Sequence, residues 1–291
     1  METSELLKKV RKIEIKTKGL TKQIFAGQYH SAFKGKGMAF SEVREYQYGD
    51  DIRSIDWNVT ARFSSPYIKI YDEERELTVI LLIDMSHSHQ FGTSKSFKDE
   101  MLTEMAAVLS FSAIKNNDKV GVIFFTNKVE KFIPPKKGVT HILRIISELI
   151  DFQPQNSGTD ISEALRFLTN AIKKRSTAFI LSDFIDHKGF EDAIKIANKK
   201  HDVIAVKVND IREQEIPDIG FARIRDAESG KLIWVDTSDL MIRKRFFDNY
   251  IRHELYLKDV FSRTGVDVVN IKTGQDYIKP LMNFFKKRGK R

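Results

Sequence analysis

The stretch LTVILLIDMSHS, residues 77–88, decides the fold class of this 291-residue chain. Residues 79–83 are apolar without a break, which is the pattern of a strand covered on both faces in a parallel sheet. Similar runs return at residues 119–125, 177–182 and 203–208, and helical patterns fall between them at 95–115, 139–151, 160–173 and 188–199. This alternation predicts an α/β fold, with a Rossmann-like, mostly parallel sheet and helices on both faces.

The other segments extend this plan. Residues 129–133 follow the second strand too closely for a helical crossover, so we expect one short antiparallel strand there. Residues 221–236 have the pattern of a hairpin that turns near residue 229. A long helix over about 239–263, a strand at 266–271 and a helix to about 287 follow.

Two domains are predicted. Residues 1–76 hold a short amphipathic helix at 5–18 and a charged segment at 31–76 that we expect to be irregular. Residues 77–291 form the sheet domain, with the hairpin as an insertion at about 209–237.

Composition excludes several kinds of chemistry. The chain has no Cys, so disulfides, thiolate zinc sites, iron–sulfur clusters and a Cys nucleophile are excluded. No stretch has the 18 or so uncharged apolar residues that a membrane span needs, and the N-terminus lacks the apolar region of a signal peptide. We therefore expect a cytoplasmic protein.

The net charge of +9 suggests an anionic partner such as nucleic acid or a membrane, but its distribution argues otherwise. Residues 1–40 hold 9 Lys/Arg against 3 Asp/Glu, and residues 272–291 hold 7 against 1. The central 231 residues sum to −3. Two basic ends thus flank a slightly acidic body, which is no continuous nucleic-acid-binding stripe.

Hard oxygen ligands follow the predicted strands, and ligands of open α/β sheets bind at this edge. Asp84 ends the first strand, and Ser86 and Ser88 follow at two-residue spacing. Thr159 precedes the helix near 160, and Asp183 follows the strand 177–182. One carboxylate at each of two strand ends, with hydroxyls between, suits Mg²⁺, which accepts few carboxylates and keeps several waters.

This pattern resembles the metal-ion-dependent adhesion site of von Willebrand factor A domains. The resemblance implies that Asp84, Ser86 and Ser88 are the DxSxS ligands, Thr159 the threonine ligand and Asp183 the fourth-strand aspartate. It implies Mg²⁺ or another divalent cation such as Mn²⁺ or Ca²⁺, with an acidic partner group completing the shell. The family's usual Thr-Asp-Gly reads Ser182-Asp183-Phe184 here, which puts the local turn in question but not the ligand.

A second signature precedes the sheet, in GKGMAFSEVREYQYGDDIRSIDWNVTAR, residues 35–62. Its matching positions are Gly35, Gly37, Phe40, Glu42, Arg44, Tyr46, Gly49, Asp50, Asp51, Arg53, Ile55, Asp56, Trp57, Ala61 and Arg62. The segment is similar to a bacterial family of unknown function, domain family fifty-eight, in which a von Willebrand A-like domain follows. That resemblance implies a MoxR-type AAA+ ATPase as partner, with a joint chaperone-like role in maturation or assembly of client proteins.

The charged residues of this signature alternate in sign. We expect its arginines to pair with its carboxylates and clamp the segment to the sheet domain, with a partner-docking surface as the alternative. We expect Trp57 to anchor a core.

These observations predict a non-enzymatic, metal-dependent interaction adaptor. One alternative is a Mg²⁺-dependent phosphoryl-transfer enzyme that uses the same oxygens, although a phosphatase of the haloacid-dehalogenase kind needs an Asp where Ser86 stands. Another is nucleic-acid binding through the basic ends. The motifs of a P-loop and of a serine-hydrolase elbow are absent from the sequence, and His87 and His89 lack the further ligands that zinc needs.

Overall fold

The computed structural model describes residues 10–11, 13–14, 39–63, 65–72, 76–86, 98–186, 188–225 and 232–290. Its internal contacts divide the chain into two compact units, residues 33–77 and the rest. The larger unit contains the predicted sheet, and the smaller unit contains the charged signature.

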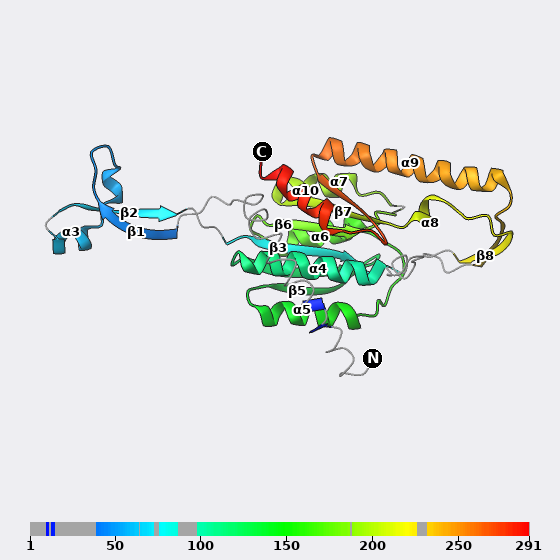
Figure 1. Ribbon diagram of the computed structural model, residues 1–291, viewed down its shortest axis with the longest axis horizontal. Helices are drawn as coiled ribbons and strands as arrows, with labels where there is room; N and C mark the ends of the chain where they lie inside the picture. The colour runs from blue at the N-terminus through cyan, green and yellow to red at the C-terminus, as the bar shows by residue number, and fades with distance from the viewer. Residues whose placement is uncertain are drawn as a thin grey trace. The chain divides into compact units, whose positions relative to one another are not determined.

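A six-stranded sheet forms the larger unit, in the order β10-β7-β6-β3-β4-β5 (Figure 1). Its strands are β3 (Thr78–Asp84), β4 (Lys119–Phe125), β5 (Val129–Lys136), β6 (Thr177–Ser182), β7 (Asp202–Asn209) and β10 (Asp267–Lys272). All neighbours pair in parallel except β4 and β5. Both the mostly parallel sheet and the single antiparallel strand were predicted, and both are confirmed.

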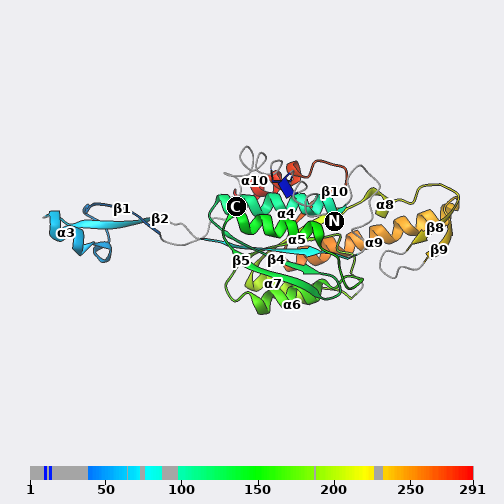
Figure 2. The ribbon, with the colours of Figure 1, turned by 90° about the horizontal axis from the view of Figure 1, so that it is seen from below.

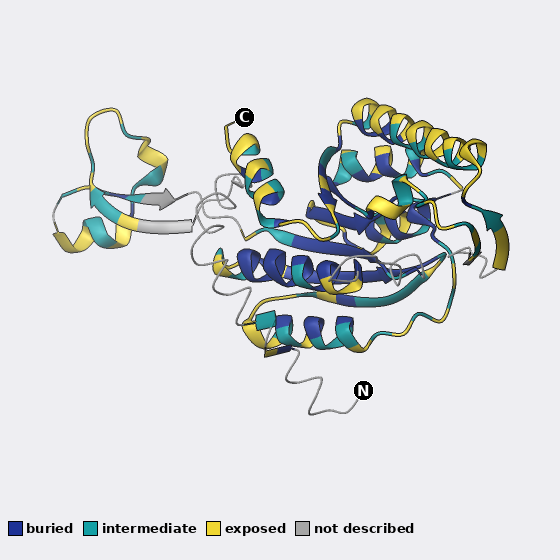
Figure 3. Ribbon diagram, turned by 45° about the vertical axis from the view of Figure 1, so that its right-hand side comes forward, coloured by how far each residue is buried: buried dark blue, intermediate teal, exposed yellow. Residues whose placement is uncertain are grey.

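Helices cover both faces of this sheet, as predicted. They are α4 (Lys98–Lys115), α5 (Val139–Asp151), α6 (Ile161–Ala171), α7 (Glu191–Lys200), α9 (Leu240–Thr264) and α10 (Ile278–Arg288). Figure 2 shows α4, α5 and α10 on one side and α6 and α7 on the other. Helix α9 joins the second group, because its buried residues pack into the same cluster as those of α6 and α7. The dark strands and helix α4 in Figure 3 mark the resulting core, in which residues 79–83 are fully buried.

The antiparallel edge strand β5 contacts β4 at Gly121. A Cβ there would lie 2.9 Å from the backbone nitrogen of Pro135, so glycine is required for the close approach. The register shifts at this point, between Val120 and Val122. Proline is tolerated in β5 because an edge strand leaves one side of its backbone unpaired.

The predicted hairpin is present, and it follows β7 and a short helix, α8 (Ile211–Gln214), that was not predicted. Its strands β8 (Phe221–Arg225) and β9 (Leu232–Asp236) pair antiparallel, and the expected turn near residue 229 lies outside the described residues. Phe221 and Trp234 are both exposed, with ring centroids 6.2 Å apart.

The smaller unit corrects the expectation that residues 31–76 are irregular. Strands β1 (Ala39–Glu45) and β2 (Tyr67–Asp72) pair antiparallel, with the 3₁₀ helix η2 (Ile52–Ser54) and helix α3 (Trp57–Phe63) between them. A register shift between Phe40 and Glu42 interrupts β1. That irregularity breaks the two-residue alternation by which a strand is recognised in sequence.

Several charged residues of the signature have partners within this unit. Arg44 binds both carboxylate oxygens of Asp50 at 2.8 Å, which is the predicted kind of bidentate pair. The side chains of Asp51 and Asp56 instead accept backbone N–H groups at the starts of η2 and α3. Trp57 is 68% exposed, so its assignment as a core anchor was wrong. Its helix has only seven residues, none of them buried.

The predicted helix at 5–18 lies mostly outside the described residues. Four of its residues are described, at positions 10, 11, 13 and 14, and all four are helical. Val10 is buried in a cluster with residues of α4 and α5, such as Phe111 and Ile146. Among the described helices, none combines the length and apolar character needed to cross a membrane.

Candidate functional site

The candidate site lies at the carboxyl edge of the sheet, where Asp84 ends β3. Its side chain is 0% exposed. Oδ1 accepts the backbone N–H of Ser86 at 3.0 Å, and Oδ2 accepts the hydroxyl of Ser182 at 2.6 Å. Donors from its own loop and from the end of β6 thus orient this carboxylate.

The loop after Asp84 is also fixed to the neighbouring strand. Met85 donates its N–H to the carbonyl of Phe125 at the end of β4, at 2.8 Å. Ser86 is buried beside it. Ser88, the third residue of the predicted motif, lies outside the described residues.

Thr159 reaches the same edge through the segment that leads into α6. The next residue, Asp160, donates its N–H to the carbonyl of Thr126, just after β4, at 3.0 Å. The Asp160 side chain caps α6 by accepting the N–H of Glu163 at 2.9 Å. Thr159 itself is buried. The local sequence therefore places a hydroxyl near the ends of β3 and β4, with the helix cap as its support.

The turn after β6 holds Asp183 in place with an unusual backbone. Phe184 has φ of 61°, in the left-handed region that glycine normally occupies. Its N–H donates to the hydroxyl of Ser182 at 2.9 Å, and the N–H of Ile185 donates to Oδ1 of Asp183 at 3.1 Å. The turn therefore forms without the glycine that the resemblance led us to expect.

Ring packing accounts for the phenylalanine. The Phe184 side chain is fully buried and meets Phe261 of α9 edge to face, with centroids 5.2 Å apart and planes at 87°. Such packing opposes a backbone cost of about 1–2 kcal/mol for a non-glycine residue in this region.

Asp183 is paired with a lysine that the sequence analysis missed. Nζ of Lys98, the first residue of α4, lies 3.2 Å from Oδ2 of Asp183 and also binds Oε1 of Glu213 on α8. Lys98 is 0% exposed. Burial alone would lower the pKa of Lys98, but the two carboxylates outweigh burial and hold that pKa above its usual value. The one available sequence signal was a lysine in the first turn of a helix, where the helix dipole disfavours a cation.

The donor set suits a hard divalent cation. Asp84, Ser86, Thr159 and Asp183 are all buried at one edge of the sheet, and they offer two carboxylates and two hydroxyls. Among the described residues, no group of three or more His or acidic side chains is arranged to hold a metal. A cation here would therefore rely on hydroxyls and water beside the two aspartates, and it would share Asp183 with Lys98.

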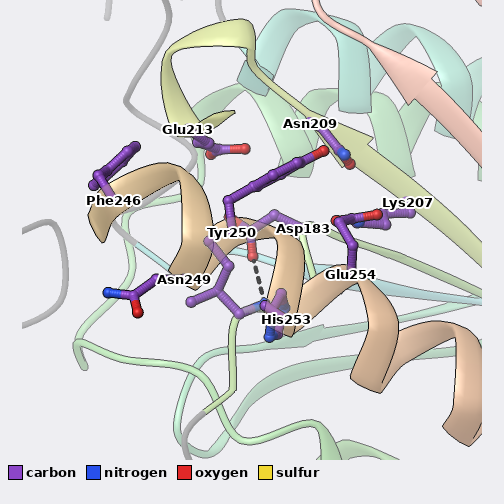
Figure 4. A pocket seen from close by; sticks show the side chains of 10 residues that line it. Asp183, Lys207, Asn209, Glu213, Phe246, Asn249, Tyr250, His253 and Glu254 are labelled. Atoms are coloured by element: carbon purple, nitrogen blue, oxygen red, sulfur yellow. Dashed lines mark hydrogen bonds and ion pairs between the residues drawn. The ribbon is translucent and has the colours of Figure 1, made fainter. Parts of the chain in front are cut away.

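A cavity of about 390 Å³ adjoins Asp183 (Figure 4). Its lining comes from the ends of β6 and β7 and from α8 and α9: Asp183, Ile185, Lys207, Asn209, Glu213, Phe246, Asn249, Tyr250, His253 and Glu254. Lys207 pairs there with Glu254. Burial lowers the pKa of the His253 ring from its ordinary value. Asp183 and Glu213, the two residues whose carboxylates bind Lys98, both line this cavity.

The fold and this edge define an α/β sheet domain with a polar site at the strand ends. The chain belongs to the family described as "Protein of unknown function DUF58", whose profile matches residues 42–256. An uncharacterised protein of Mycobacterium tuberculosis, Rv1480, is 27% identical over 291 residues, which is 99% of this chain and 91% of that protein.

Two solved structures are similar to this chain at low sequence identity, and the first of them shares its fold. BatB from Bacteroides thetaiotaomicron is 19% identical, with a TM-score of 0.50 over 74% of this chain and all of that one. The VWA domain of SpRpn10 is 9% identical, with a TM-score of 0.43 over 72% of this chain and 95% of that one.

Proposed function

We propose that this protein is a non-enzymatic adaptor that holds a divalent cation at Asp84, Ser86, Ser88, Thr159 and Asp183. The observation that supports this proposal most is that two buried aspartates and two buried hydroxyl residues lie at one edge of the sheet. Mg²⁺ is the first candidate, with Mn²⁺ and Ca²⁺ next, because all the donors are oxygens. A bound cation would supply an electrophilic centre that attracts an acidic side chain of a partner protein.

The chain's own residues prepare this site. Ser182 and the N–H of Ser86 orient the Asp84 carboxylate, and the left-handed turn at Phe184 directs Asp183. Fixed donors reduce the entropy lost on binding, which favours a site that is formed before the ion arrives.

The partner we propose is a MoxR-type AAA+ ATPase in the cytoplasm, together with a client protein that offers an acidic residue. The family resemblance of residues 35–62 supports this choice. The joint role would be chaperone-like maturation or assembly of the client.

Calorimetric titration with Mg²⁺ alone tests the site first. Asp84→Asn keeps the size of the side chain but removes its charge, so Mg²⁺ binding should be lost while the circular dichroism spectrum stays unchanged. Asp192→Asn, on the exposed surface of α7, is the matched control and should bind like the parent protein.

Association with the MoxR-type ATPase of the same genome tests the function. Binding should require a divalent cation and should fail both with EDTA and with Asp84→Asn. Undiminished association in EDTA would overturn the metal bridge.

A further inference from the structure

Asp183 already has a cationic partner in the protein, the ammonium group of Lys98. Lys98 is completely buried, and its Nζ contacts Oδ2 of Asp183 and Oε1 of Glu213. A buried ammonium is stable only when paired, and both carboxylates serve that purpose here. The formal charges of the three groups sum to −1.

The ammonium already contacts the Asp183 carboxylate, which is one of the proposed metal ligands. Oδ1 of Asp183 already accepts the N–H of Ile185, and Oδ2 faces Lys98. A divalent cation bound to this carboxylate would lie within a few ångströms of the ammonium, where like charges repel strongly because water is largely excluded.

Glu213 gives Lys98 a second partner at that moment. Its Oε2 accepts the N–H of Asp210 at 2.9 Å, which fixes the carboxylate on α8. Lys98 can therefore weaken its contact with Asp183 and still remain paired. Both acids line the cavity of Figure 4, through which a small ion can approach Asp183.

We infer that Lys98 is an internal competitor of the metal for Asp183, and that it keeps affinity for the bare ion low until a partner's carboxylate adds negative charge. This inference rests on the proposed metal site and adds its regulation: the bare cation binds weakly, and the carboxylate of the partner strengthens its binding. Lys98 is thus a positioning residue that acts through Asp183.

The test is calorimetric titration of Mn²⁺ alone into the parent protein, Lys98→Met and Lys207→Met. Lys207 is the matched control, since it is also a buried lysine paired with a glutamate at the cavity, but its partner is Glu254. Lys98→Met should bind Mn²⁺ about tenfold more tightly or better, and Lys207→Met should stay within about twofold of the parent.

Each outcome is decisive. Equal or weaker Mn²⁺ binding by folded Lys98→Met, beside measurable binding by the parent, overturns the competition and leaves the metal site standing. An equal gain in Lys207→Met also overturns it, because general charge then explains the effect. If neither the parent nor Lys98→Met binds Mn²⁺, both proposals fail. Should Lys98→Met not fold, Lys98→Gln retains a polar side chain and carries the same expectation.

Discussion

The hydroxyl of Ser182 donates a 2.6 Å hydrogen bond to Oδ2 of Asp84, joining residues 98 positions apart in the chain. The same hydroxyl oxygen accepts the N–H of Phe184 at 2.9 Å. One buried side chain therefore links the end of β3 to the left-handed turn after β6. Its removal should affect both.

Ser182→Ala should lower the free energy of unfolding by about 1–3 kcal/mol, because a buried carboxylate oxygen and a buried N–H each lose a partner. Urea denaturation measures the change. Ser238→Ala removes a hydroxyl that binds Asp236 on the exposed surface, and it should stay within about 0.5 kcal/mol of the parent. Equal effects of the two changes would contradict the role given to Ser182.

Phe184 allows a test in which the usual order of glycine and alanine is reversed. Phe184→Ala loses the ring contacts with Phe261, at a cost of about 3–5 kcal/mol, and retains the unfavourable backbone. Phe184→Gly loses the same contacts but accepts φ of 61° freely, so it should be about 1 kcal/mol more stable than the alanine variant. Parallel urea titrations compare them, and a less stable glycine variant would argue against a strained turn.

We expect buried His201 to make the protein less stable in acid. The side chain is fully buried, and burial lowers its pKa from 6.5 to about 4. Because the unfolded state binds the proton more readily, the contribution is complete above pH 6.5 and declines as the pH falls toward 4, by up to about 3 kcal/mol. Unfolding free energies across this range should fall less steeply for His201→Gln. Superimposable slopes would show that His201 is not responsible.

We expect lysine to be a poor replacement for Arg288. It binds Asp202 at the start of β7 and Asp267 at the start of β10. A guanidinium can serve both carboxylates and a single ammonium cannot, so Arg288→Lys should cost about 1 kcal/mol. Lys287→Met, a neighbouring change on an exposed side chain, should cost less than about 0.5 kcal/mol in the same thermal unfolding assay.

The sheet was predictable because its strands are continuous apolar runs. The apolar run at residues 79–83 predicts a strand buried on both faces, and the structure confirms it. Strand β1 was not predictable, since the shift at Phe40 and Glu42 breaks its alternation. Trp57 was misassigned because large aromatic residues are usually buried, whereas its short helix buries nothing.

The site was predictable only in part. Strand ends and hydroxyl spacing placed Asp84, Ser86, Thr159 and Asp183 on one edge of the sheet, and the structure has these residues there. Their role as metal ligands stays a prediction. Pairing of Lys98 with Asp183 joins positions 85 residues apart, and no local pattern encodes such a contact. Long-range ion pairs depend on the packing of α4 and α8 against the strand ends, which appears only in three dimensions.

The amino ends of the strands lie away from the candidate site, and Arg288 fixes a helix there. Its contacts fix the last turn of α10 at the amino ends of β7 and β10, whereas Asp84 and Asp183 lie at the carboxyl ends of β3 and β6. A sensor surface attached through this last turn, for example at position 287, would therefore lie at the edge of the sheet opposite Asp84 and Asp183. The support would then be kept away from the carboxyl ends of β3 and β6, where the candidate metal ligands lie.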